Sequence, residues 1–305
     1  MTLAERLASA PVSWGVWERT AGRADLVPRA ELLEAVASLE YRALELGPPG
    51  YLGDDAEAVR EALAPFELEL AGGFAALHLA DEERFRADLA ELERTLEALA
   101  AWPQAPALLA DAGSPERSRA AGRPAELRRT ALSGPSLERA VARLTRAAEA
   151  CAVHGVRAAL HPETGSYAES PWDVETLLER VDEELLGLCF DTGHVLVGGG
   201  SPASLARDWG ERIVHVHVKD VSGEVLARLR AGSVDVETAW AEGLFCPLGE
   251  GEVDLAGVLA APAVQEARWL VLEQDRVAVT RAELEAVRDA EARNRELVLE
   301  LGGSV

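Results

Sequence analysis

The sequence predicts an α/β protein built as a single (β/α)₈ TIM barrel, and three observations support this fold class. Short β-prone runs alternate with longer amphipathic runs along the whole chain, as expected for parallel strands joined by helical crossovers. Eight runs have the character of strands. The length of 305 residues suits one barrel, for which about 250 residues is typical. We therefore expect residues 1–305 to form one domain.

The expected strands and helices follow one another along the chain. Strands are predicted at Pro11–Val16, Arg42–Leu46, Leu68–Phe74, Pro106–Ala110, Val156–His161, Leu186–Asp191, Ile213–Val218 and Trp269–Glu273. Helices, with an apolar residue at every third or fourth position, are predicted at Arg29–Leu39, Asp55–Leu63, Glu83–Ala100, Ser136–Ala152, Trp172–Val181 and Arg281–Leu299. Eight strands followed by helices favour a closed barrel over an open sheet.

Two insertions interrupt this alternation. Gly113–Pro135 is rich in Arg and Gly, and Val221–Gly243 adds helical material after the seventh strand. Both follow strands, so we expect them to cover the mouth of the barrel. The basic stretch Arg117–Arg129 reads as a loop with a solvated face, and the first insertion is therefore predicted to be a mobile cover.

Composition and charge exclude several classes of protein. A hydrophobic fraction of 48% indicates a large core, and a net charge of −23 opposes binding to nucleic acids or anionic membranes. No apolar run approaches the length of a membrane span, and the N-terminal residues lack the apolar core of a signal peptide. Cys151, Cys189 and Cys246 show neither disulfide nor zinc-ribbon spacing. We expect a cytoplasmic protein with reduced thiols, which could form a homo-oligomer.

Reactive side chains collect where the predicted strands end, and a barrel builds its active site at that rim. Five strands end in carboxylate or imidazole groups, which are Glu45; His161 and Glu163; Asp191 and His194; His215 and His217; and Glu273 and Asp275. Carboxylate and imidazole ligands suit Mn²⁺, Co²⁺, Mg²⁺ or Zn²⁺, and no cysteine stands beside them to form a thiolate-rich zinc site. The sequence therefore predicts one catalytic divalent metal ion.

Alternation along the seventh strand turns His215, His217 and Lys219 to one side and the intervening valines to the other. His217, nearer the rim, is the better metal ligand, whereas His215 is expected to be a satisfied core histidine. Lys219 is the only lysine in the chain. Because a lysine, unlike an arginine, can release its proton, we predict a catalytic role for Lys219.

Other candidates retain more than one interpretation. Glu45 could be a metal ligand, a substrate-orienting acid or a partner behind a ligand. A carboxylate buried at a strand end without a cation would be costly, which favours Asp191 and Glu273 as ligands. Aromatic residues near the first two strands, Trp14, Trp17 and Tyr51, more often serve packing, but such rings also suit the apolar faces of a sugar.

With these residues in view, the sequence resembles the xylose isomerase-like barrel superfamily of sugar isomerases and epimerases, and within it the inosose dehydratase family. The matching stretches are Ala10–Gly15, Glu45–Tyr51, His161–Ser166, Phe190–His194, His215–Asp220 and Pro247–Gly251. They run through most of the chain in the family's order.

The resemblance implies a divalent metal, most often Mn²⁺ or Co²⁺, bound at the ends of strands five to eight. Asp191, His217 and Glu273 match the superfamily's Asp, His and Glu ligands, and His194 is expected near the substrate. The predicted fourth ligand is Glu163, with His161 and Glu169 as alternatives. Trp14, Tyr51 and His161 are the predicted substrate-binding side chains.

The resemblance favours a lyase that dehydrates a keto-cyclitol through a metal-stabilised enolate. Lys219 or Glu45 would be the base that removes the α-proton, and His194 the general acid for the departing hydroxide. A sugar or keto-acid isomerase or epimerase would share the enolate. A non-catalytic sugar-binding barrel is a third possibility. Endonucleases of the superfamily need more His and Glu ligands than this chain offers, and its acidic charge opposes DNA.

Overall fold

A third strand that breaks in its middle closes the barrel. The computed structural model describes residues 1–303, and nine strands form one parallel sheet in the order β3-β2-β1-β11-β8-β7-β6-β5-β4. β3 (Glu69–Leu70) and β4 (Gly73–Leu77) stand at opposite ends of that order but are separated in sequence only by Ala71 and Gly72. The two ends of the sheet are therefore one interrupted strand, and the ring closes as an eight-stranded barrel.

The other strands of the barrel lie close to their predicted positions, with one exception. They are β1 (Leu7–Ser9), β2 (Ala43–Leu44), β5 (Ala107–Asp111), β6 (Ala158–His161), β7 (Leu186–Asp191), β8 (Ile213–Val218) and β11 (Leu270–Leu272). The prediction of a first strand at Pro11–Val16 is wrong. Pro11 has no N–H to donate to a neighbouring strand, and Pro11–Trp14 instead forms the 3₁₀ helix η2, which ends at Gly15 with a φ of 74°.

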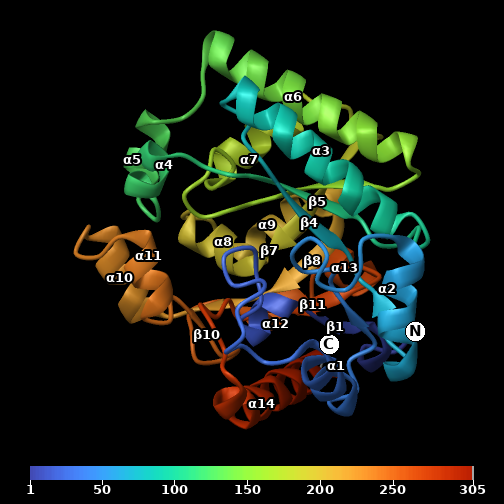
Figure 1. Cartoon of the computed structure of the whole chain (residues 1–305). Helices are drawn as coiled ribbons and strands as arrows, with labels where there is room; N and C mark the ends of the chain where they lie inside the picture. Colours follow the sequence, from blue (N-terminus) through green and yellow to red (C-terminus); the bar gives the residue numbers. More distant parts are fainter. Residues whose placement is uncertain (304–305) are drawn as a thin grey trace.

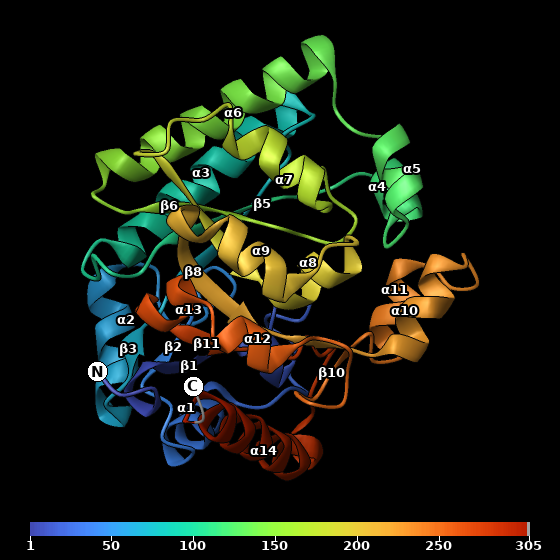
Figure 2. The same cartoon turned by 180° about the vertical axis from the view of Figure 1, so that it is seen from behind.

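Helices surround the barrel on its outer face (Figures 1 and 2). The six predicted helices are all present, as α1 (Arg29–Ser38), α2 (Ala56–Leu63), α3 (Glu82–Leu99), α6 (Gly134–Val153), α7 (Pro171–Leu178) and α14 (Leu284–Gly302). Shorter helices are α8 (Thr192–Val197), α9 (Pro202–Asp208), α12 (Leu255–Leu259) and α13 (Pro262–Glu266). Among residues 1–303, no helix combines the length and apolar character needed to cross a bilayer.

Both insertions fold into helical pairs that project on the same side of the molecule (Figures 1 and 2). The first contains α4 (Pro115–Ala120) and α5 (Pro124–Arg129), and the second α10 (Gly223–Arg230) and α11 (Val236–Ala241). The strands β9 (Asp220–Val221) and β10 (Phe245–Cys246) pair antiparallel at the base of the second. The prediction of a loop at Arg117–Arg129 is therefore wrong, because Pro115 and Pro124 occupy first positions of helices, where proline is favourable.

The predicted solvated face of the first insertion is also wrong for one residue. Arg117 is fully buried, whereas Arg119, Arg128 and Arg129 are exposed. Nη2 of Arg117 lies 2.7 Å from Oδ2 of Asp173, so the buried guanidinium is paired. The basic stretch thus has exposed arginines on its helices and one buried arginine, Arg117, that is paired with Asp173.

The strand β8 turns its imidazoles into the barrel. Val216 and Val218 belong to the large apolar cluster between strands and helices, while His215 and His217 both contact Glu45 from β2's end, across the interior. Val214 departs from the alternation and packs with a small inner cluster near Cys189, because the register between β7 and β8 shifts at Leu188 and Cys189. The three cysteines are free thiols, as expected.

Candidate functional site

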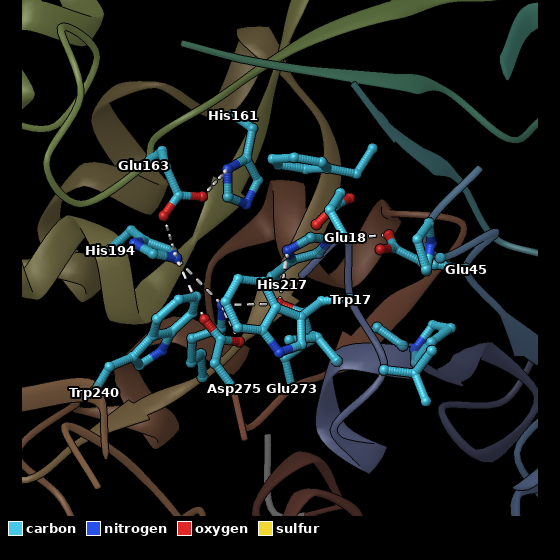
Figure 3. Close-up of a pocket in the computed structure, with 18 residues that line it drawn as sticks. Trp17, Glu18, Glu45, His161, Glu163, His194, His217, Trp240, Glu273 and Asp275 are labelled. Carbon is cyan, nitrogen blue, oxygen red and sulfur yellow. Dashed lines mark hydrogen bonds and ion pairs between the residues drawn. The ribbon is translucent and has the colours of Figure 1, made fainter. Parts of the chain in front are cut away.

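The carboxyl ends of the strands converge on one cavity (Figure 3). β6 and the residues after it contribute His161 and Glu163, α8 contributes His194, and the strand β8 contributes His217. Lys219 follows β8, and Glu273 and Asp275 follow β11. The rim predicted from strand endings is therefore a real cavity with nitrogen and oxygen atoms in its wall.

Three predicted ligands, Asp191, His217 and Glu273, lie within reach of one ion. Nδ1 of His217 is 3.4 Å from Oδ2 of Asp191 and 3.1 Å from Oε2 of Glu273. Oδ1 of Asp191 accepts the N–H of His194 at the start of α8, whereas its Oδ2 and Nδ1 of His217 are buried without a hydrogen-bond partner among the described residues. Buried polar atoms without partners are rare, and this mixed oxygen and nitrogen set could hold a divalent metal.

Glu45 lies behind His217 and not among the unpartnered atoms. Its Oε1 accepts hydrogen bonds from Nε2 of His217 at 2.9 Å and Nε2 of His215 at 2.8 Å. Burial opposes the charged carboxylate, but the two imidazoles hold the pKa of Glu45 below its ordinary value. Because the carboxylate accepts a hydrogen bond from Nε2–H, the proton of the neutral imidazole stays on Nε2. The lone pair of Nδ1 is then free to bind a metal. His215 is thereby a satisfied core histidine, as expected.

Lys219 is surrounded by acids. Its Nζ lies 3.1 Å from Oδ2 of Asp191, 2.9 Å from Oε2 of Glu273 and 2.8 Å from Oδ1 of Asp275. Although burial favours the neutral amine, these three carboxylates raise the pKa of Lys219 well above its ordinary value. The side chain is therefore a buried ammonium surrounded by three carboxylates, and its Nζ also lies 3.3 Å from Nε2 of His194.

Glu163, the predicted fourth ligand, lies in a second group with His161 and His194. Its Oε2 is 3.7 Å from Nδ1 of His161, and its Oε1 is 3.8 Å from Nε2 of His194. His161 comes closer to the first three residues, since its Nε2 lies 3.6 Å from Oδ2 of Asp191. Glu169, the other alternative, faces away from this cluster and accepts the backbone N–H groups of Gly122 and Gly165.

The aromatic wall differs from the predicted one. Trp14 is fully buried and donates to Oγ of Ser9, and neither Trp14 nor Tyr51 is among the residues that line the cavity. Trp17 and Trp240 line it instead, with ring centroids 5.1 Å apart. The Trp14 and Tyr51 side chains fill space within the protein, while Trp17 and the second insertion supply the rings that a ligand would meet.

Sequence reasoning placed Asp275 at the rim but gave it no role, and it missed Trp240. Asp275 lies two residues after Glu273, in the same strand ending. Burial raises the pKa of Asp275 to about 6, despite the nearby ammonium of Lys219. Trp240 gave no local signal, because only the folded second insertion brings it to Trp17. The expectation of no nearby cysteine is also wrong, since Cys189 lies beside His161 and His217. Burial raises the pKa of this thiol to about 11, so it is not a thiolate.

Of the two insertions expected to cover the mouth, the first does not line the cavity. None of the residues from 113 to 135, all of which the structure describes, lines the cavity. The second insertion does reach it, through Trp240. The first insertion therefore lies beside the site, against the loop that follows β6.

Comparison with known proteins gives the same family as the sequence motifs. Residues 33–290 match the family model described as a xylose isomerase-like TIM barrel. An inosose dehydratase of Geobacillus kaustophilus (strain HTA426) is 29% identical over 271 residues, 88% of this chain and 87% of that protein. The rhizopine catabolism protein MocC of Rhizobium meliloti is 33% identical over 258 residues, 81% of this chain and 75% of that protein.

A solved structure agrees with this fold. The IOLI protein, crystallised with a bound zinc atom, has a TM-score of 0.67 to this chain, with 98% of each chain covered and 14% identity. The barrel closure, the arrangement of strand endings and the match over most of the chain all agree. The protein belongs to the xylose isomerase-like TIM barrel family.

Proposed function

We propose that the protein is a metal-dependent hydro-lyase that removes water from a keto-cyclitol or a closely related hydroxyketone. The observation that carries the proposal is the cluster that Asp191, His217 and Glu273 form with the ammonium of Lys219 at the wall of the cavity. The name of the Geobacillus relative, inosose dehydratase, supports the reaction. A bound divalent cation would act as a Lewis acid that polarises a carbonyl and stabilises the negative charge developing on its oxygen.

Asp191, His217 and Glu273 would hold the metal together with a fourth side chain. His161 is favoured over Glu163 for that position, because its Nε2 lies 3.6 Å from Oδ2 of Asp191, whereas the potential ligand atoms of Glu163 group only with those of His161 and His194. The zinc atom in the IOLI structure supports a metal in this fold. Mn²⁺ or Co²⁺ remains our first expectation, with Mg²⁺ or Zn²⁺ as alternatives that the same ligands accept.

Glu163 is then free to act on protons. It lines the cavity with its side chain 28% exposed. Of the two bases considered from sequence, Glu45 already accepts two imidazole N–H groups and Lys219 already carries its proton. We therefore assign removal of the α-proton to Glu163 and protonation of the departing hydroxide to Lys219.

This division of roles balances the reaction. Glu163 takes the α-proton, and the electron pair of that C–H bond becomes the new carbon–carbon double bond. The carbon–oxygen bond at the β-position breaks, its electron pair leaves with the hydroxide, and a proton from Lys219 converts this hydroxide to water. Proton exchange between Glu163 and Lys219 through solvent returns both groups to their starting states.

An isomerase or epimerase would share the first step and differ only in the carbon that regains the proton. A non-catalytic sugar-binding barrel would not need a lysine and a free carboxylate beside an assembled ligand set. A substrate panel of inososes and ketoses, offered to protein loaded with Mn²⁺ or Co²⁺, separates these functions. Dehydration gives a product lighter by one water with the absorption of an enone, whereas isomerisation gives a new isomer of unchanged mass. If the protein converts none of the compounds in the panel, both enzymatic functions are contradicted.

A further inference from the structure

Two half-buried tryptophans form a corner in the wall of the cavity. The indole rings of Trp17 and Trp240 both line it, with centroids 5.1 Å apart and planes inclined at 59°. Nε1 of Trp17 donates to the carbonyl of Val277 at 2.9 Å, which fixes the direction of its ring. Because Trp240 belongs to α11, the corner depends on the second insertion folding against the loop after η2.

A second contact joins the same two segments. Nη1 of Arg19 lies 3.1 Å from Oε1 of Glu237, which stands one helical turn before Trp240 on α11. The guanidinium of Arg19 also lies over the ring of Trp17, 5.5 Å from its centroid. Both charges are exposed, so the ion pair adds little stability. Arg19 is nevertheless engaged outside the cavity, whose wall it does not join.

Much of the remaining wall is apolar. Its apolar members include Ala10, Pro11, Val12, Val16, Pro48 and Phe74. A hydroxyl pressed against such a wall loses its water without gaining a hydrogen bond, which costs free energy. The C–H faces of a carbocycle carry no group that needs a partner, and aromatic rings suit them. A ring whose hydroxyls lie around its edge therefore fits this cavity better than an open-chain polyol, which has no face free of hydroxyls.

Glu18 stands beside this corner with a carboxylate that no other residue uses. The side chain is exposed and lines the cavity, so it lies at the mouth (Figure 3). Among residues 1–303, only its own backbone N–H donates to it, since Arg19 pairs with Glu237. Arg94, in a neighbouring hollow that Glu18 also lines, pairs with Glu91. The carboxylate of Glu18 is therefore free to accept hydrogen bonds from the hydroxyls of a ligand.

The charges around the cavity oppose an anionic group on a ligand. No arginine of residues 1–303 lines the cavity, and its one lysine, Lys219, already faces three carboxylates. Glu18 adds a further negative charge at the mouth. Away from the metal-binding residues, a phosphate or carboxylate group would therefore leave water without gaining the charged hydrogen bonds that arginine or a free lysine supplies.

We propose that Trp17, Glu18 and Trp240 form a specificity edge that selects an uncharged ring as the substrate. The two indoles pack on the C–H face of the ring. The carboxylate of Glu18 accepts hydrogen bonds from hydroxyls at the edge of the ring and repels anionic ligands. The inference rests on the proposed function for one point only, the direction of the ring carbonyl toward the metal-binding residues. It adds to that function the residues that choose the ring.

This selection can be measured with ligands that have no carbonyl and so cannot be dehydrated through an enolate. Isothermal titration calorimetry on protein loaded with Zn²⁺ compares three of them. They are scyllo-inositol, all of whose hydroxyls are equatorial; sorbitol, an open-chain hexitol; and inositol monophosphate. We expect scyllo-inositol to bind at least about tenfold more tightly than either of the others, the factor that corresponds to one well-placed contact. Equal or tighter binding of sorbitol or of the monophosphate would overturn the inference.

Variants separate the two parts of the specificity edge. Glu18→Gln keeps the shape and loses the charge, so scyllo-inositol should bind about tenfold more weakly and the preference over the monophosphate should decrease. Trp240→Ala should lower the affinity for scyllo-inositol to that for sorbitol, and Trp240→Phe should restore most of it. Two controls lie outside the cavity wall, namely Glu224→Gln, exposed on α10, and Trp172→Ala, beneath Arg128. Both should bind all three ligands as the wild type does.

The two proposals fail in different ways. Wild-type affinity ratios in Glu18→Gln and in Trp240→Ala would overturn the specificity edge, even if the protein dehydrates an inosose. Selective binding of scyllo-inositol that depends on both residues, by a protein that dehydrates no inosose, would contradict the proposed function alone. If Trp240→Ala does not fold, Glu18→Gln still decides, because an exposed side chain can be replaced without disturbing the core. An unchanged preference over the monophosphate in that variant would then overturn the inference.

Discussion

Oε1 of Glu45 lies 2.9 Å from Nε2 of His217, while Nδ1 of the same ring points to Asp191 and Glu273. The carboxylate thereby fixes which nitrogen of His217 is available to a metal. Glu45→Gln keeps the shape but weakens the acceptor, so we expect metal affinity to fall by about 10–100-fold, as for other partners of metal-binding histidines. Equilibrium dialysis with Co²⁺ or Zn²⁺ measures this. Unchanged affinity with a large loss of kcat would instead identify Glu45 as the base.

Removal of a ligand should abolish metal binding outright. Asp191→Ala and Glu273→Ala each delete one oxygen of the set that meets Nδ1 of His217, and we expect neither purified variant to retain stoichiometric metal. Glu163→Gln is the matched control, because we place Glu163 on the proton-transfer path. It should keep the metal and lose kcat by roughly 10²–10⁴-fold. Full metal and activity in both alanine variants would show that the site lies elsewhere.

Lys219 should be needed for the chemical step and not only for its charge. Lys219→Arg keeps a cation among the three carboxylates, but a guanidinium does not release its proton at any relevant pH. We expect near-normal metal content and thermal stability, with kcat lowered by roughly 10²–10⁴-fold. Metal analysis and a melting curve serve as controls. Wild-type turnover in this variant would reduce Lys219 to an electrostatic or compositional role.

The parts of the site that follow from strand geometry could be predicted from the sequence. Parallel strands of a barrel end at one rim, so the residues at the ends of β7, β8 and β11 are expected to be neighbours. Asp191, His217 and Glu273 are indeed close to one another. Alternation along β8 likewise predicted the inward direction of His215 and His217. These conclusions depend on local periodicity and on the closure of the barrel, and both can be read from one chain.

Contacts between distant segments could not be predicted in this way. Arg117 is buried because it meets Asp173, 56 residues further along, and a lone arginine among Gly, Pro and Ser is ordinarily exposed. Trp240 reaches Trp17 only through the fold of the second insertion. The choice between Glu163 and His161 as a ligand depends on the path of the loop after β6, which no periodicity describes.

The buried pair of Arg117 and Asp173 predicts an unequal response to mutation. Arg117→Met would leave the carboxylate of Asp173 buried without its cation, so we expect the free energy of unfolding to fall by about 3–5 kcal/mol. The double variant Arg117→Met, Asp173→Leu should recover most of this loss, because no charge is left unpaired. Urea unfolding followed by circular dichroism measures both. A double variant as unstable as the single one would mean that the hydrogen bonds of Arg117 to Ser166 and Leu127, and not the charge pair, dominate.

Glu169 should make stability depend on pH. The side chain is 1% exposed, and burial raises its pKa to about 7. The hydrogen bonds from Gly122 and Gly165 and the charge of Arg117 lower this pKa, whereas the charge of Asp173 raises it. As pH rises from about 4.5, the unfolded chain loses this proton first, so the free energy of unfolding falls until the folded pKa near 7 is passed. The loss should be on the order of 3 kcal/mol, since each pKa unit corresponds to about 1.4 kcal/mol. Glu169→Gln cannot titrate at this position. The unfolding free energy of the wild type minus that of this variant should therefore decrease between pH 5 and pH 8, because the contributions of all other titrating groups cancel in the subtraction. A difference that stays constant or increases with pH would show that Glu169 is ionised throughout and accepts its two backbone N–H groups as a carboxylate.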